Sequence, residues 1–352
     1  MTDSSSGGAA ADHENTAAPR RVTRRDVARE AGTSVAVVSY VLNDGPRPVA
    51  APTRKRVLDA VEKTGYRPNI LAQALSKGVT RTFGFVVPNI ANPFIASVAH
   101  LIEKQLFAQG CVLLLGDSGD DREREAELVE SFLERQVDGV IYMGVTQDLH
   151  LESLVRTRTP VVVFTHASSD GLAASVRIDE RAAARAATEH LIEHGRTRLG
   201  VITGPETMLN AQIRLGGWQD AVEAAGLPVV SEWILHTPYT RRGGYQAGRR
   251  LLDADQLPDA VFAGNQEHAL GLISALSERQ VRVPDDLAVI CLNGTPDAEY
   301  SVPSLSSVRQ PIEAMAERAL AVLSNPDAYR PDPITFDFEL VPYRSCGCPH
   351  ER

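Results

Sequence analysis

The chain of 352 residues has few of the features that would indicate secretion, membrane insertion or enzymatic catalysis. No apolar run reaches the roughly 20 residues that a membrane-spanning helix needs. The first 20 residues are small and polar and lack the apolar stretch of a signal peptide, so we expect a disordered arm in a cytoplasmic protein. No G-x-S-x-G, Walker loop or G-x-G-x-x-G motif occurs, and nothing therefore requires nucleophilic or nucleotide chemistry.

Cysteine is also scarce, and four Cys in a chain of this kind predict free thiols, not disulfides. Cys346 and Cys348 are not followed or preceded by a matching pair of metal ligands in the sequence. His190 and His194 stand in an H-x-x-E-H string, the pattern of inverted zinc proteases. That string ends a predicted helix, where His is favoured by the helix dipole, and no downstream Glu offers a third ligand. We therefore expect no metal, no cofactor and no enzymatic activity.

Charge divides the chain into two parts of opposite sign. Residues 20–78 contain 12 Lys and Arg against 5 Asp and Glu, a net charge of +7, whereas the chain from Val79 onward has a net charge of −13. A basic module of about 60 residues on an acidic body indicates contact with phosphate groups by one end only. The negative body favours solubility and repels nonspecific DNA.

Residues 22–43, VTRRDVAREAGTSVAVVSYVLN, predict two short helices joined by a tight turn, an arrangement that reads DNA. Thr23 is placed to cap the first helix, with Asp26 as a short-armed capping-box partner. Gly32 stands where the chain must turn, and Ser34 can cap the second helix. The alternative is an ordinary helical hairpin within a larger domain.

The next segment predicts a third helix and then a short apolar one. Pro52 and Thr53 open the third helix and Gly65 ends it. The stretch YRPNILAQALSKG breaks at a proline and continues as a two-turn apolar helix that would be marginal alone in water. Such a helix suits a wedge for the DNA minor groove, although a linker helix packed on the body is the alternative.

From about Arg81 the sequence alternates strand-like runs rich in Val, Ile and Leu with amphipathic helices. This alternation predicts parallel sheets covered on both faces. About 260 residues exceed a comfortable single core, so we expect two α/β lobes. A ligand site is then expected in the seam between them, at the carboxyl ends of the strands.

These stretches together resemble the LacI/GalR family of bacterial transcription regulators, most clearly in VTRRDVAREAGTSVAVVSYVLN, GYRPNILAQALSKG, FGFVVPNIANPF and VPDDLAVICLNGTPDAEYSVPSLSSVRQP. The resemblance implies an all-α helix-turn-helix headpiece with a hinge helix, followed by a two-lobe core like a periplasmic binding protein. The implied division is a disordered arm (1–20), a helix-turn-helix domain (21–66), a hinge helix (67–79), an effector-binding and dimerisation domain (80–345) and a tail (346–352).

In a protein of this kind, the second helix would enter the major groove of an operator. The resemblance then places Val35, Ala36 and Tyr40 toward base edges and Ser39 toward a phosphate or base. Tyr40 is a departure, since many relatives have Arg or His there and a phenol cannot make the two-pronged guanine contact of Arg. Leu75 matches the hinge leucine that opens the central base step. The remaining predicted DNA-binding residues are Thr23, Ser34, Asn43 and Asn69.

The resemblance also implies an effector pocket. Phe94 and Ile95 match positions of the first lobe that line it, and Tyr239 falls where relatives stack an aromatic ring on the ligand. Arg214 matches the arginine that binds sugar hydroxyls or a ligand carboxylate, and an unpaired cation in a cleft would need such a partner. Asn265 follows a buried strand, as the ligand-facing Asn of the family does.

Three pocket positions depart from the family pattern by losing a carboxylate. Thr165 stands where Asp is common, Gln266 stands where Asp commonly follows Asn, and Asn293-Gly294 replaces an acidic pair. Because carboxylates are the best acceptors for a vicinal diol, these departures argue against a plain monosaccharide as the ligand.

The sequence therefore predicts a repressor that binds a pseudo-palindromic operator as a homodimer or higher oligomer under the control of a sugar or related polar metabolite. Two alternatives stay open, a two-lobe small-molecule-binding protein or enzyme with a vestigial headpiece, and a constitutive repressor whose pocket binds nothing.

Overall fold

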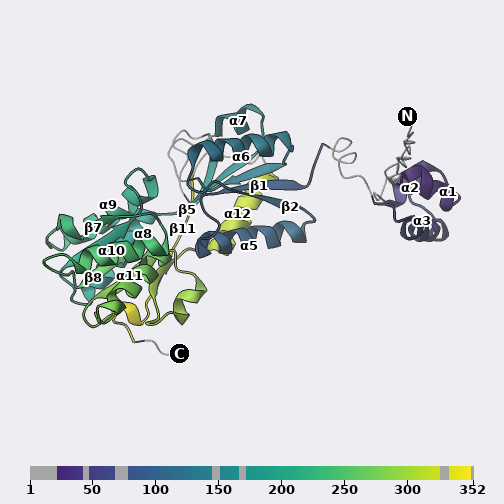
Figure 1. The fold of residues 1–352 in the computed structure, drawn as a ribbon. Helices are drawn as coiled ribbons and strands as arrows, with labels where there is room; N and C mark the ends of the chain where they lie inside the picture. The colour runs from purple at the N-terminus through teal and green to yellow at the C-terminus, as the bar shows by residue number, and fades with distance from the viewer. Residues whose placement is uncertain are drawn as a thin grey trace, which may run out of the picture. The chain divides into compact units, whose positions relative to one another are not determined.

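A computed structural model describes residues 22–42, 47–67, 78–144, 151–165, 172–325 and 333–349. The chain forms two compact units, residues 1–80 and residues 81–352 (Figure 1). Among the described residues, no helix has the length and apolar character to cross a membrane.

The first unit is a small three-helix domain, α1 (Arg24–Glu30), α2 (Val35–Leu42) and α3 (Ala51–Thr64). The predicted capping box is present, because the Asp26 carboxylate accepts hydrogen bonds from the Thr23 backbone N–H at 2.9 Å and from its hydroxyl at 2.6 Å. Gly65 ends α3 with a left-handed backbone (φ 64°). The helices share a small apolar core made of Val27, Ala28, Ala31, Val38, Val41, Val57, Ala60 and Tyr66.

The second unit contains two six-stranded sheets, as the alternating pattern predicted. In the first sheet the strand order is β11-β5-β4-β3-β1-β2 and every pair is parallel. Its strands are β1 (Thr82–Val87), β2 (Val112–Asp117), β3 (Gly139–Tyr142), β4 (Val161–Phe164), β5 (Ala174–Ile178) and β11 (Pro333–Phe336).

The second sheet has the order β12-β10-β9-β8-β6-β7, parallel except for the edge pair of β12 with β10. Its strands are β6 (Leu199–Thr203), β7 (Ile234–His236), β8 (Ala260–Ala263), β9 (Ala288–Leu292), β10 (Ser306–Arg309) and β12 (Glu339–Val341). Because β11 returns to the first sheet and β12 to the second, the chain crosses between the lobes three times.

Helices cover both sheets, and most coincide with the predicted stretches. They are α5 (Pro93–Ala108), α6 (Arg122–Glu134), α7 (Leu151–Arg156), α8 (Glu180–Glu193), α9 (Leu209–Ala224), α10 (Arg241–Leu252), α11 (Gln266–Glu278) and α12 (Ile312–Ser324). Short 3-10 turns lie at Ser231–Trp233 (η1), Pro296–Tyr300 (η2) and Arg344–Cys346 (η4).

Candidate functional site

The second helix of the first unit presents one face to solvent and one to the core. Val38 and Val41 are buried at 0% and 3% exposure. The predicted reading residues Val35 and Ala36 are exposed, while Tyr40 is half-buried. Ser39 of the same helix is half-buried, whereas Ser34, just before α2, and Thr23, just before α1, are exposed. The other predicted DNA contacts, Asn43, Asn69 and Leu75, lie outside the described residues.

The second unit contains a pocket with about 640 Å³ of empty space, part of which is open solvent. All seven residues predicted for the effector line it, namely Phe94, Ile95, Thr165, Arg214, Tyr239, Asn265 and Asn293. Eight further residues that were not predicted also line it, which are Pro88, Asn89, Asn92, Asp120, Met143, Gly144, Asn210 and Thr240.

The pocket lies at the carboxyl ends of strands from both sheets, which is where parallel α/β folds place ligands. Thr165 directly follows β4 and Asn293 directly follows β9. Both have left-handed backbones, with φ values of 81° and 60°. This conformation is costly for a β-branched residue such as Thr165, and such strain is concentrated at functional sites.

Arg214 is buried in the pocket wall, and its charge is neutralised within the protein. Its guanidinium donates to both carboxylate oxygens of Glu180, at 3.1 and 2.7 Å, and to the backbone carbonyl of Gly264 at 2.8 Å. Burial alone would lower the pKa of Arg214, but the Glu180 carboxylate more than offsets this and raises it. The expectation that Arg214 is an unpaired cation is therefore wrong, because the first turn of α8 supplies its partner.

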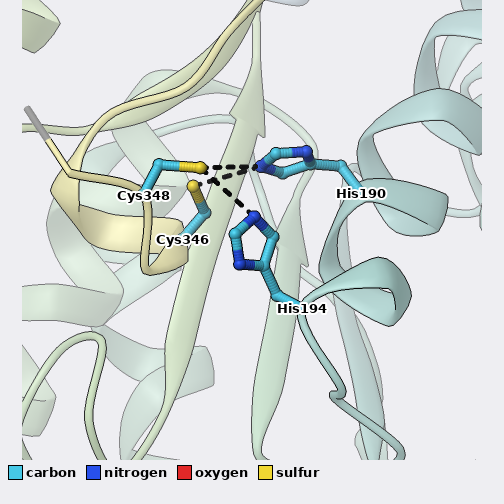
Figure 2. Close-up of side chains that lie close together, drawn as sticks. All are labelled: His190, His194, Cys346 and Cys348. Carbon is cyan, nitrogen blue, oxygen red and sulfur yellow. Dashed lines mark hydrogen bonds between the residues drawn. The ribbon is translucent and has the colours of Figure 1, made fainter.

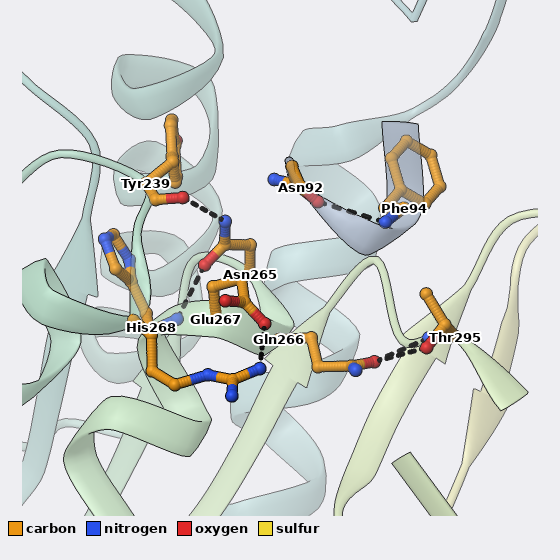
Figure 3. A network of polar contacts seen from close by, with 9 residues as sticks. Asn92, Phe94, Tyr239, Asn265, Gln266, Glu267, His268 and Thr295 are labelled. Carbon is orange, nitrogen blue, oxygen red and sulfur yellow. Dashed lines mark hydrogen bonds and ion pairs between the residues drawn. The ribbon is translucent and has the colours of Figure 1, made fainter. Parts of the chain in front are cut away.

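Asn265 caps α11 while it faces the pocket (Figure 3). Its side-chain oxygen accepts from the His268 backbone N–H at 2.8 Å, and its amide nitrogen donates to the Tyr239 carbonyl at 3.3 Å. The Tyr239 ring stacks on His268, with centroids 5.2 Å apart, and lies 5.3 Å from the Arg214 guanidinium carbon. Burial lowers the pKa of His268 to about 4, which keeps it neutral.

Two neutral residues that replace carboxylates of the family pattern have partners inside the protein. The Gln266 side-chain oxygen accepts from the backbone N–H of Thr295 at 2.7 Å and from its hydroxyl at 3.1 Å (Figure 3). The Gln310 amide donates to the Asn293 side-chain oxygen at 2.6 Å. Gln266 thus stabilises a neighbouring loop and does not line the pocket.

The pocket offers a ligand mostly neutral hydrogen-bonding groups. Asp120 is the carboxylate among the described lining residues, and partial burial together with the nearby charge of Asp117 raises its pKa. The side-chain oxygen of Asn210 is buried and has no hydrogen-bond partner among the described residues. An amide oxygen in this position can accept a hydrogen bond from a ligand hydroxyl.

A second cluster of chemically reactive residues lies away from the pocket residues in sequence. His190, His194, Cys346 and Cys348 bring their ligand atoms within 4.8 Å of one another (Figure 2). The argument that Cys346 and Cys348 lack a matching pair of ligands is therefore wrong. The pair is supplied by α8, more than 150 residues earlier in the chain, and no local spacing could have revealed it.

Comparison with known proteins agrees with both units. Residues 23–69 match the family described as bacterial regulatory proteins, lacI family, and residues 188–333 match a periplasmic binding protein-like domain. Catabolite control protein A of Priestia megaterium is 37% identical over 305 residues, which cover 86% of this chain and 92% of that protein. The ribose operon repressor of Escherichia coli strain K12 is 32% identical over 303 residues, with 86% and 92% coverage.

Two solved structures share the fold of both units. The Lac repressor dimer bound to operator and the anti-inducer ONPF aligns with a TM-score of 0.84 at 22% identity, covering 93% of this chain and 99% of that one. The complex of the transcriptional regulator CelR with cellobiose aligns with a TM-score of 0.69 at 29% identity, covering 92% and 100%. The fold of both units is thus one already seen with DNA and with small ligands.

Proposed function

The chain belongs to the lacI family of bacterial regulatory proteins, and we propose from this premise that it is a transcriptional repressor controlled by a small molecule in the pocket between its two lobes. The observation that carries the proposal is that all seven predicted effector residues line one pocket of a chain that also has an exposed helix-turn-helix face. As a DNA-binding regulator it would act in the bacterial cytoplasm.

The exposed face of α2 is the proposed reader of the operator. Val35 and Ala36 offer small apolar contacts to thymine methyl groups, while Tyr40 offers one hydroxyl in place of the fork of Arg. We expect Thr23, Ser34 and Ser39 to bind the phosphate backbone or neighbouring bases and so to set the position of the helix. For Asn43, Asn69 and Leu75 the same roles rest on the family resemblance alone.

A homodimer on a pseudo-palindromic operator follows from the same premise. A surface suited to a second copy exists at the edge of the first sheet, where α5 and β2 expose three apolar residues. Phe107 is 75% exposed, Val112 58% and Leu115 44%. An unpaired edge strand and a neighbouring helix that leave apolar side chains exposed can form an interface with a second copy.

The effector we propose is a neutral metabolite that carries hydroxyl groups, such as a sugar or a nucleoside. The Arg214–Glu180 pair is neutral as a unit, and at least three of the five Arg214 N–H groups are used within the protein, so at most two remain to donate to ligand oxygens. The Phe94 ring lines the pocket and offers an apolar contact to the ring of the ligand, beside Tyr239, which is itself stacked on His268. An anionic effector would find no uncompensated cation among the described lining residues.

No enzymatic role is proposed, since the named relatives are transcriptional regulators and the pocket contains no pair of nucleophile and base among its described residues. The alternative of a constitutive repressor is distinguished by the effector test below.

The operator test selects bound fragments of the source genome and measures their affinity at two salt concentrations. Specific binding should exceed binding to scrambled DNA by at least about 1000-fold. Tyr40→Ala should relax the base preference at one position per half-site by about 1–3 kcal/mol. Leu58→Ala on the solvent face of α3 is the control and should leave selectivity unchanged. Equal affinity for all sequences would contradict the proposal.

The effector test is a thermal-shift screen of neutral sugars, nucleosides and their phosphorylated forms. A ligand present at 100 times its dissociation constant should add about 2.7 kcal/mol to the free energy of unfolding. The same ligand should change operator affinity, and Asn210→Ala should weaken its binding. A screen in which only anionic compounds bind would refute the proposed ligand class, and ligand binding without any change in operator affinity would refute effector control.

A further inference from the structure

The end of α8 and the C-terminal segment together form a cluster of two imidazoles and two thiols. His190 Nε2 lies 3.2 Å from Cys346 Sγ and 3.6 Å from Cys348 Sγ. His194 Nε2 lies 3.2 Å from Cys348 Sγ. In Figure 2 the four side chains converge on one point from two separate parts of the chain.

We propose that this cluster is a structural metal site of the Cys2His2 type, suited to Zn²⁺. Two sulfur and two nitrogen ligands in close array are typical of tetrahedral zinc. A tetrahedron with zinc–sulfur bonds of about 2.3 Å and zinc–nitrogen bonds of about 2.05 Å has N···S edges of about 3.6 Å. The three contacts given above, at 3.2 to 3.6 Å, need only a small expansion to admit the ion.

The backbone of each segment favours this convergence. His190 and His194 are four residues apart at the end of a helix, so both rings lie on one side of it, with His194 as the C-cap residue. Between the two cysteines, Gly347 has a φ of 106°, a backbone that other residues rarely adopt. This turn directs Cys346 and Cys348 toward the same pair of histidines.

The segment that contains the cysteines is anchored by buried hydrogen bonds to the second sheet. Ser345 Oγ donates to the Val289 carbonyl at 2.6 Å and accepts from the Ser306 backbone N–H at 2.8 Å. The Cys346 backbone N–H donates to Ser306 Oγ at 3.2 Å, and Cys346 itself is fully buried. Because the thiols are held on a rigid support, the site is largely organised before an ion enters.

Four protein ligands would leave no open position for water or substrate. A closed site of this kind is structural, whereas catalytic zinc sites keep a position free. The proposed ion would join the C-terminal segment to the end of α8 and so brace the second lobe. The H-x-x-E-H string therefore supplies two ligands of a structural site and not the centre of a protease.

The test is metal analysis of the full-length protein, purified reduced and without chelator, followed by exchange with Co²⁺. We expect about one Zn²⁺ per chain, and a cobalt form with the visible bands of tetrahedral Co²⁺ and a thiolate-to-cobalt charge-transfer band. Cys348→Ser and His194→Gln replace ligands that are not buried, so their folds should persist, and each should weaken Zn²⁺ binding by more than about 100-fold.

The controls are Cys111→Ser, a half-buried thiol in the first lobe, and His100→Gln, an exposed histidine of α5. Both should keep the metal and the cobalt spectrum. The proposal is overturned if folded wild-type protein does not retain Zn²⁺ after loading and dialysis, or if the two ligand variants bind as tightly as the controls. In that same reduced preparation, a chain mass lower by two hydrogen atoms, with no metal bound, would instead indicate a Cys346–Cys348 disulfide and would also overturn the proposal.

Discussion

The two ends of α8 differ in the partners of their polar side chains. At its first turn, Glu180 faces Arg214, and both side chains are only 4% exposed. At its last turn, His190 and His194 face Cys346 and Cys348, with no carboxylate or cation among the four. The two ends are separated by roughly 15–20 Å along the helix.

The difference explains why the polar groups at the Glu180 end need no further ligand, whereas the donors at the His190 and His194 end are suited to bind a metal ion. A bidentate Arg–Glu pair satisfies two charges with each other, and a third donor of Arg214 is satisfied by a backbone carbonyl. Four soft donors that face one another gain far more from a shared cation than from weak hydrogen bonds through sulfur.

The largest effect should come from breaking the ion pair at the start of α8. Glu180→Ala leaves the Arg214 cation buried without its counter-ion, so we expect the free energy of unfolding to fall by about 3–5 kcal/mol. Urea denaturation of the second unit within the full chain measures this loss.

The matched control removes both charges. Glu180→Gln combined with Arg214→Met should recover much of that stability, since no isolated charge stays buried. The double variant should nevertheless lose its effector response, because the pocket loses the donors of Arg214. If Glu180→Ala were as stable as wild type, Arg214 would have to be solvated, and the contrast between the two ends would fail.

The next effect is a pH dependence of stability. Near the Arg214 end of α8, the buried imidazole of His268 is held in its neutral form. Burial lowers the pKa of His268 from 6.5 to about 4, so the unfolded chain binds more protons than the folded one between these values. Stability due to a neutral His268 is therefore complete above pH 6.5 and decreases as pH falls toward 4, by up to about 3 kcal/mol. Unfolding curves at pH 7.5 and 4.5 should show the loss.

His268→Gln should remove that part of the acid sensitivity while lowering stability at neutral pH, because the contacts of His268 with Thr237 and the Pro238 carbonyl would be altered. His100→Gln, on the surface of α5, should leave the pH profile of the wild type in place. An unchanged profile in His268→Gln would mean that His268 is already charged in the folded protein.

The third prediction concerns the stability that a bound metal ion would add at the His190, His194, Cys346 and Cys348 cluster. Free Zn²⁺ at 100 times its dissociation constant should add about 2.7 kcal/mol to the free energy of unfolding, and chelation should remove the same amount. Cys348→Ser should be insensitive to both treatments, whereas Glu180→Ala should still respond. A response to zinc in Cys348→Ser equal to that of wild type would place the ion elsewhere.

What the sequence could predict depends on how far apart the partners are in the chain. The Thr23–Asp26 capping box and the alternation of strands and helices depend on residues within a few positions of each other, and both were predicted. The seven pocket residues were predicted from a family resemblance, and the structure does bring them together.

The partners that were missed are far apart in sequence. Glu180 and Arg214 are 34 residues apart, and His190 and Cys346 are 156 apart. Each pair meets only because the fold of the second unit places α8 beside α9 and the end of α8 beside the C-terminal segment. Composition and local spacing do not indicate such contacts. Arg214 was therefore wrongly expected to be unpaired, and Cys346 and Cys348 were wrongly expected to lack partner ligands.

The smallest change in the free energy of unfolding should come from removing the helix cap beside Glu180. This cap is a local contribution to stability, in contrast to the long-range Glu180–Arg214 pair and the long-range His–Cys cluster. The Asp179 carboxylate accepts a hydrogen bond from the Ala182 backbone N–H at 3.0 Å and caps α8. Asp179→Ala should cost about 1 kcal/mol, as loss of an N-cap does elsewhere. Its unfolding curves should keep the wild-type responses to zinc and to acid, because the cap contacts neither the thiols nor His268. A loss as large as that of Glu180→Ala would show that the start of α8 depends on its cap and not on the buried ion pair.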